Sequence, residues 1–172
     1  MSEQPEIREI AQNLASVELK IRQKGLKNLK SVLNQTAPEQ FSKICVGLFY
    51  FYWYSDGLDN QLADRAAICG LLDLIRKDDK SAWLETFMAT LIDLWDGVDY
   101  HRSDKYLKLL REFFTTIYTW FNSLQDAKKV WVQWNDYLAT NVLFHYKCEL
   151  ISGANRPAVF ICASRHCRQY RV

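Results

Sequence analysis

The chain has 172 residues, a length that fits one domain, or one domain with an irregular end. Hydrophobic residues make up 49% of it and aromatic residues 14%, which is ample material for a buried core. Only six glycines and three prolines are present, which argues against disorder and against a turn-rich β-sandwich or β-barrel. The chain has 22 basic and 20 acidic residues, and the resulting net charge of +2 does not by itself indicate a nucleic-acid partner.

The cysteines and the N-terminal sequence favour a reducing compartment. Five cysteines are an odd number and show no disulfide framework. The first residues after Met1, SEQPEIREI, contain acids and no apolar stretch, unlike a secretory signal. The longest uncharged run, residues 44–55, is far shorter than the ~20 residues of a membrane span. We therefore expect free thiols and no contact with a membrane.

Apolar residues recur with helical spacing along most of the chain. The first short helix is predicted over residues 7–14. Ser16 is expected to cap a second helix that runs to about Leu33. Pro38 is expected to open a third helix, which continues to Tyr52. This third helix is apolar on nearly every side, which predicts a central position in the fold.

Two more helices are predicted between Gly57 and about residue 95. Asp56-Gly57 reads as a turn, and a fourth helix follows it to about Leu74. A fifth helix spans about residues 84–95. Gly97 then stands where a glycine in the left-handed conformation often ends a helix.

A long sixth helix, capped by Asp99, and a seventh over about residues 126–150 complete the pattern. About seven antiparallel helices without a convincing strand predict an all-α fold. Its architecture is either a HEAT-like solenoid or an irregular helical bundle. We expect one all-α domain over residues 1–152, followed by an irregular basic tail at 153–172 that contains arginines and no acid.

Motifs of enzymes are missing from the sequence, which has no glycine-rich phosphate loop, HExxH motif or nucleophile elbow. Four acids surround one predicted helix junction, but nothing couples them to a base or a metal ligand. They are Asp93, Asp96, Asp99 and Asp104. A zinc site would have to use the group Cys148, Cys162, His166 and Cys167, which lacks the usual paired short spacings. We expect no catalytic residue, cofactor, metal or small-molecule substrate.

One predicted helix concentrates positive charge without any acid between Glu18 and Glu39. Its cations are Lys20, Arg22, Lys24, Lys27 and Lys30. At about 100° per residue, Lys20, Lys24 and Lys27 share one face, which Lys30 continues. Such a face neutralises phosphates, although solvated lysine-rich faces are also common in soluble proteins. These five residues are our candidates for contact with RNA or a partner.

Three stretches are informative in combination. They are LASVELKIRQKGLKNL at 14–29, KICVGLFYFYWYSDGLDNQLADRAA at 43–67, and WDGVDYHRSDKYLKLLREFF at 95–114. The third contains the pattern Trp-x-Gly-x-Asp-x-x-Arg-x-Asp-Lys-Tyr. In order and spacing, the three resemble the ribosomal RNA processing protein 1 family of nucleolar proteins, with the resemblance covering about residues 14–121.

The residue types of the third stretch also have a structural interpretation. They predict a rigid corner between two helices, in which Arg102 pairs with Asp99 in the first helical turn. The signature residues of this corner are Trp95, Gly97, Asp99, Asp104 and Tyr106. Arg102 and Lys105 are further candidates for contact with RNA or a partner.

The resemblance implies a non-enzymatic helical scaffold in pre-rRNA processing and biogenesis of the large ribosomal subunit. Its partners would be proteins of pre-ribosomal particles, and the chain would also contact pre-rRNA. Its location would be the nucleus, within the nucleolus. The sequence departs from the family after about Leu124, so the tail reads as an aberrant or truncated end. Two alternatives remain open: a helical-repeat adaptor unrelated to ribosome assembly, and a metal-dependent enzyme that uses the tail cysteines.

Overall fold

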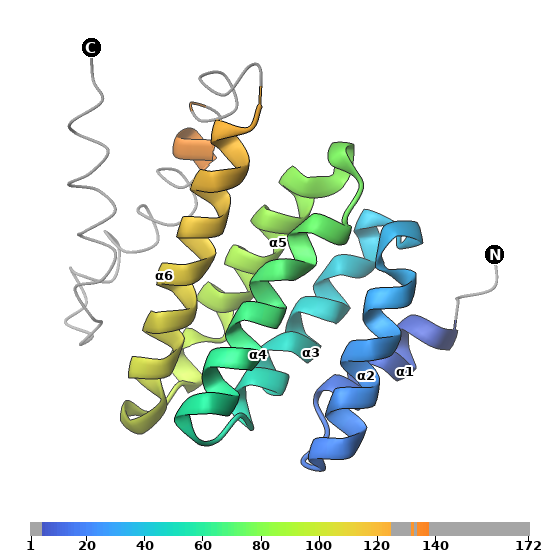
Figure 1. Ribbon diagram of the computed structural model, residues 1–172, viewed down its shortest axis with the longest axis vertical. Coiled ribbons are helices and arrows are strands. Elements are labelled where there is room, and N and C mark those ends of the chain that lie inside the picture. The colour runs from blue at the N-terminus through green and yellow to red at the C-terminus, as the bar shows by residue number, and fades with distance from the viewer. Residues whose placement is uncertain (1–4, 125–131, 133, 138–172) are drawn as a thin grey trace. The chain divides into compact units, whose positions relative to one another are not determined.

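A computed structural model of the protein describes residues 5–124, 132 and 134–137 (Figure 1). Residues 5–124 contain six α-helices, joined by short 3-10 helices and turns, and the described residues contain no strand. The all-α prediction is confirmed. The helices are α1 (Pro5–Leu14), α2 (Leu19–Val32), α3 (Phe41–Trp53), α4 (Leu58–Gly70), α5 (Lys80–Asp93) and α6 (Tyr100–Asn122).

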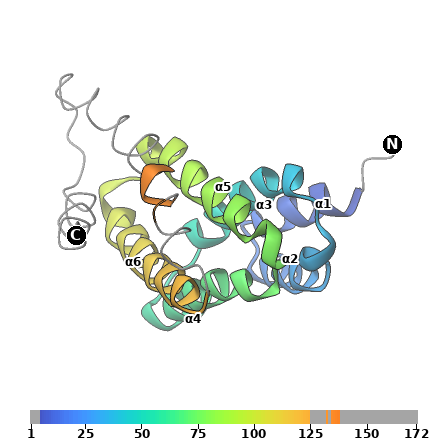
Figure 2. The ribbon, with the colours of Figure 1, turned by 90° about the horizontal axis from the view of Figure 1, so that it is seen from above.

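The chain divides into two compact units, and the division falls inside α6, after Thr116. In the first unit, α1, α3 and α5 lie in one layer while α2 and α4 lie in another (Figure 2). The solenoid and the irregular bundle both stay predictions. In the second unit, the ring of Phe121 lies 6.4 Å from that of Trp134. The predicted domain boundary at residue 152 lies outside the described residues.

Helix α3 is central to the first unit, as its all-round apolar sequence predicts. It contacts α1, α4 and α5, and most of its side chains are buried. Phe41 at its start packs edge-on against Trp83 of α5, with ring centroids 5.2 Å apart. Aromatic pairs in this geometry stabilise a core beyond the area that they bury.

A glycine permits the close packing of α1 on α3. A Cβ atom at Gly47 would lie 2.9 Å from the carbonyl oxygen of Ala11 and 3.1 Å from its Cα atom. Real Cβ atoms do not approach backbone this closely, so a larger residue would push the two helices apart. Gly47 therefore fixes the distance between the first and third helices.

The structure corrects the predicted start of the second helix and agrees with that of the third. The second helix begins at Leu19 after Glu18, so Ser16 is not its cap. Instead, the hydroxyl of Ser16 accepts a hydrogen bond from the N–H of Glu18 at 3.2 Å, which stabilises the turn before the helix. Pro38 occupies the first position of a 3-10 helix that leads directly into α3, as expected for proline.

The prediction for Gly97 is wrong. Of the described residues only Gly57, in the predicted turn before α4, has a positive φ, of 80°. After α5 ends, the chain continues into a 3-10 helix, Trp95–Gly97, whose bonds include Gly97 N–H to the oxygen of Leu94 at 3.2 Å. Because these tighter bonds satisfy the end of the helix, no left-handed residue is needed.

The seventh predicted helix falls mostly outside the described residues. Positions 132 and 134–137, the part of it that is described, are helical.

Candidate functional site

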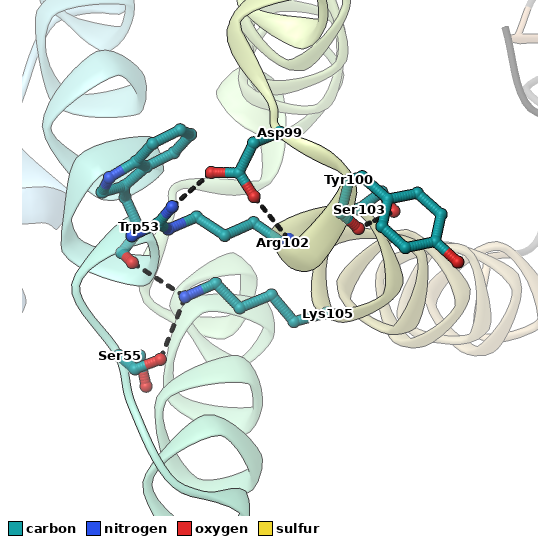
Figure 3. Close-up of polar contacts among 7 residues, drawn as sticks. All are labelled: Trp53, Ser55, Asp99, Tyr100, Arg102, Ser103 and Lys105. Atoms are coloured by element: carbon teal, nitrogen blue, oxygen red, sulfur yellow. Dashed lines mark hydrogen bonds and ion pairs between the residues drawn. The ribbon is translucent and has the colours of Figure 1, made fainter.

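The three family-like stretches meet where α3 ends, at Trp53, Tyr54 and Ser55. The last carbonyl groups of an α-helix have no partner within the helix, and the negative end of its dipole lies there. Cations from α2 and α6 provide these partners. Figure 3 shows the α6 side of this junction.

Lys105 of α6 binds the end of α3 from within the fold. Its ammonium group donates hydrogen bonds to the carbonyl oxygens of Trp53 at 2.8 Å and Ser55 at 3.0 Å (Figure 3). Only 6% of the residue is exposed, and burial lowers the pKa of the ammonium group. Lys105 was a candidate for partner contact, but its charged group is used inside the protein.

Arg22 of α2 binds the same region from the other side. Its guanidinium donates to the carbonyl oxygen of Tyr54 at 3.0 Å, and to those of Val17 at 2.6 Å and Ser16 at 3.1 Å. The residue is only 5% exposed. Arg22 therefore joins the start of α2 to the end of α3, and it does not share the surface of the neighbouring lysines.

Asp99 caps α6 and pairs with Arg102, as predicted. One carboxylate oxygen accepts the backbone N–H of Arg102 at 2.9 Å, and the other pairs with its guanidinium. Although desolvation acts to raise the pKa of the Asp99 carboxyl, these hydrogen bonds from Arg102 lower it. The guanidinium of Arg102 also lies over the ring of Trp53, 4.4 Å from the centroid (Figure 3).

The other signature residues differ in burial. Tyr106 is buried, and its hydroxyl donates to the carbonyl oxygen of Phe49 at 2.8 Å. Asp104 is exposed and pairs with Lys108 one turn later, at 2.7 Å. Trp95 is half-buried, while Gly97 is exposed with open space around it. The corner thus combines buried contacts with an exposed turn.

The side chains of this junction bind backbone carbonyl groups and one another. Across the described ranges, no group of three His, Cys, Asp or Glu residues is placed to hold a metal ion. The thiols of Cys45 and Cys69 are buried, and burial raises both pKa values, that of Cys69 to about 12. The tail group of Cys148, Cys162, His166 and Cys167 lies outside the described residues. No helix in the described part of the chain is long and apolar enough to cross a bilayer.

The exposed face of α2 carries the remaining cations. They are Lys20, Lys24, Lys27 and Lys30, and all four are exposed. The helix contains no acid, and none of the four lysines forms an ion pair with another described residue. We call these four residues the lysine face. Uncompensated charges on one helix face attract anions over roughly a Debye length, about 8 Å at physiological salt.

The helical period could have separated Arg22 from the lysine face. At about 100° per residue, Arg22 lies about 200° from Lys20, on the opposite side of the helix. Lys105 precedes the buried Leu109 by four residues, so it lies on the core side of α6. What the sequence does not contain is the identity of their partners, which are backbone carbonyls far along the chain.

Comparison with known proteins gives concordant results. The family described as nucleolar protein Nop52 matches residues 5–155. A protein of Caenorhabditis elegans named ribosomal RNA processing protein 1 homolog is 30% identical over 129 residues, which cover 70% of this chain and 32% of that protein. A human protein named ribosomal RNA processing protein 1 homolog B is 35% identical over 122 residues, which cover 63% of this chain and 15% of that protein. The chain therefore spans less than a third of either relative.

Proposed function

Because the chain belongs to the Nop52 family of nucleolar proteins, we propose that it is a helical scaffold in pre-rRNA processing and biogenesis of the large ribosomal subunit. The observation that carries this proposal is the family match over residues 5–155, together with relatives named for ribosomal RNA processing. The family is described as nucleolar, which confirms the predicted nucleolar location. In this proposal the chain has no catalytic role, and its partners are proteins of pre-ribosomal particles.

The polar junction supports a role as a rigid scaffold. Arg22 and Lys105 join α2 and α6 to the end of α3 through hydrogen bonds to backbone carbonyl groups. Arg102, which pairs with Asp99 at the start of α6, adds a cation–π contact to Trp53. Hydrogen bonds of buried cations to the backbone of another helix favour one arrangement of the helices, because a displaced helix would leave those carbonyl oxygens without a donor. A fixed arrangement is what a scaffold needs in order to present surfaces in a constant geometry.

The lysine face supports direct contact with pre-rRNA in this proposal. Its four exposed lysines follow one side of α2 with no acid in that helix. Lysines that neutralise phosphates release counterions, which gives binding a strong dependence on salt. Because phosphate contacts carry little sequence information, we expect this face to strengthen binding while other parts of the particle determine position.

Depletion of the protein from nucleolus-containing cells tests the proposed role. We expect unprocessed precursors of large-subunit rRNA to accumulate, and precursors of the small subunit to change little. Re-expression of the chain should restore the normal pattern. Unchanged large-subunit precursors after complete depletion would contradict the proposal.

A charge variant tests the proposed RNA contact. Lys20→Gln, Lys24→Gln and Lys27→Gln together should weaken binding of the purified chain to a pre-rRNA fragment. Binding to a single strand releases about 0.7 counterions per neutralised phosphate, which gives log K a negative slope against log salt. The loss of three lysines should therefore make this slope less steep by about 2. The matched control, with the same change at Lys77, Lys108 and Arg111, removes three cations from other elements. Equal losses in both variants would show general charge attraction and overturn the assignment to α2.

A further inference from the structure

The exposed side of α2 is a continuous polar stripe. Apart from Leu19 at the first position, every exposed side chain of this helix belongs to it, and its members are Lys20, Gln23, Lys24, Lys27, Lys30 and Ser31. At about 100° per residue, these positions fall within an arc of about 120°. Lys20 and Lys30 are ten residues apart, which is about 15 Å along the helix axis. The stripe is therefore a straight row of cationic and polar side chains on one helix.

The stripe keeps its positive charge because acids lie away from it. Glu18 directly precedes α2, and no acid follows until Glu39. The exposed acid Glu9 belongs to α1, which packs on α2 at Gly25, where a Cβ atom would lie 3.0 Å from a backbone atom of α1. Gly25 lies about 160° around the helix from Lys27, so α1 covers the opposite side of α2. Figure 2 shows α2 at the outer edge of its layer.

The stripe lacks the feature by which proteins commonly hold a single-stranded nucleic acid, which is an aromatic surface for stacked bases. No aromatic residue occurs between residues 14 and 37. The most exposed aromatic side chains of the described residues, Tyr50, Tyr100 and Tyr118, belong to α3 and α6. A flexible single strand on α2 would therefore lose conformational freedom without stacking to offset that loss.

We propose that the lysine face binds the backbone of a double-stranded segment of RNA. A duplex presents its phosphates in a fixed geometry and at a higher density than a single strand, so a rigid row of lysines neutralises several of them without ordering the nucleic acid. The bases of an RNA duplex lie in a deep, narrow major groove, and proteins recognise it mostly by shape and through phosphates and 2′-hydroxyl groups. The proposal rests on the proposed contact with pre-rRNA and names the form of RNA.

Two uncharged members of the stripe suit this ligand. Gln23 is exposed beside the lysines, and its amide both donates and accepts hydrogen bonds. The hydroxyl of Ser31 donates to the carbonyl oxygen of Asn28 at 2.7 Å and still accepts a hydrogen bond from a ligand. Because a 2′-hydroxyl group is both donor and acceptor, it matches both side chains.

Titration of the purified full chain with two RNA probes tests the proposal. One probe is a duplex of about 20 base pairs, longer than the ~16 base pairs that double-stranded RNA-binding domains span. The other is a single strand with the same number of phosphates and a sequence that does not fold. At equal salt we expect the duplex to bind at least about fivefold more tightly. Equal or tighter binding of the single strand would overturn the duplex preference and leave the RNA contact standing, whereas binding of neither probe would contradict the RNA contact itself.

Charge variants assign the preference to α2. Lys20→Gln, Lys24→Gln and Lys27→Gln together should weaken duplex binding about tenfold or more and remove the preference for the duplex. Lys20→Arg, Lys24→Arg and Lys27→Arg together should keep it, because arginine also binds phosphate. The control variant that removes three cations from other elements should keep it as well. Circular dichroism shows whether each variant keeps its helices. A preference that survives in the folded glutamine variant, or that is lost in the arginine variant or in the control, would overturn the proposal.

Discussion

The ammonium group of Lys105 lies 2.8 Å from the backbone oxygen of Trp53, although 52 residues separate them in the chain. A lysine in the first turns of α6 thereby satisfies the free carbonyl groups at the end of α3. On the opposite side of the same helix end, Arg22 performs the same task from α2. The junction explains why cations that read as surface residues in the sequence are buried in the fold.

Removal of the Lys105 charge should destabilise the protein. Lys105→Met keeps most of the side-chain volume but leaves the partly buried carbonyl oxygen of Trp53 and the buried one of Ser55 without this donor. An unpaired buried polar group costs about 1–3 kcal/mol, so the free energy of unfolding in urea should fall by about that amount. Lys27→Met on the exposed lysine face should change it by less than about 0.5 kcal/mol. Equal stability of the two variants would contradict the structural role of Lys105.

Variants of Arg22 and Lys24 should show that stability and RNA binding depend on different residues of α2. They are two residues apart on α2, but the first is buried and the second exposed. Arg22→Met should lower the unfolding free energy by about 1–3 kcal/mol and leave the RNA affinity of the folded protein unchanged. Lys24→Gln should show the reverse pattern. Urea unfolding and RNA titration at fixed salt measure both properties, and the account fails if Arg22→Met weakens RNA binding while Lys24→Gln does not.

The packing of α1 on α3 predicts opposite effects at two glycines. Gly47→Ala should destabilise the protein by about 1–3 kcal/mol, because the new Cβ atom would lie 2.9 Å from the carbonyl oxygen of Ala11. Gly70→Ala, at the end of α4, places its Cβ in open space with a helical φ of −66°. This variant should be more stable by up to about 1 kcal/mol. Thermal unfolding of both variants checks the contrast, which a stable Gly47→Ala protein would refute.

Asp64 should make stability depend on pH. Burial raises the pKa of its carboxyl above 3.8, although the charges of Arg22 and Lys105 act to lower it. The folded state therefore holds a proton that the unfolded state releases, so this contribution to stability is present below pH 3.8 and is lost as the pH rises through the higher folded pKa. Asp64→Asn removes this titration. Relative to the original protein, the variant should gain stability as the pH rises through that interval, as urea unfolding at several pH values would show. A constant difference would contradict the prediction.

The sequence predicts the helices and the central position of α3 well, because helical apolar spacing is a local property. It also predicts the capping of α6 by Asp99, whose partner Arg102 is three residues away. Gly97 shows where local rules fail, since a 3-10 helix and a left-handed glycine both end an α-helix and the sequence permits either. A prediction based only on the glycine therefore gives the wrong type of helix end.

The candidate site was less predictable than the helices. The lysine face follows from the helical period, but the burial of Arg22 and Lys105 depends on carbonyl groups of α3 and of the segments that flank α2 and α3. Backbone acceptors have no signature in the sequence, so a buried cation that binds them resembles a surface cation.

Sedimentation of the tagged chain from nuclear extract tests the central claim most directly. The account predicts that the chain migrates with precursors of the large ribosomal subunit, and that the variant Lys20→Gln, Lys24→Gln and Lys27→Gln shifts toward lighter fractions as salt rises, while the control at Lys77, Lys108 and Arg111 does not. RNase treatment should release the chain from these fractions. If the chain sediments only as a free 20.2 kDa protein in extract whose precursor particles are intact, the account is contradicted.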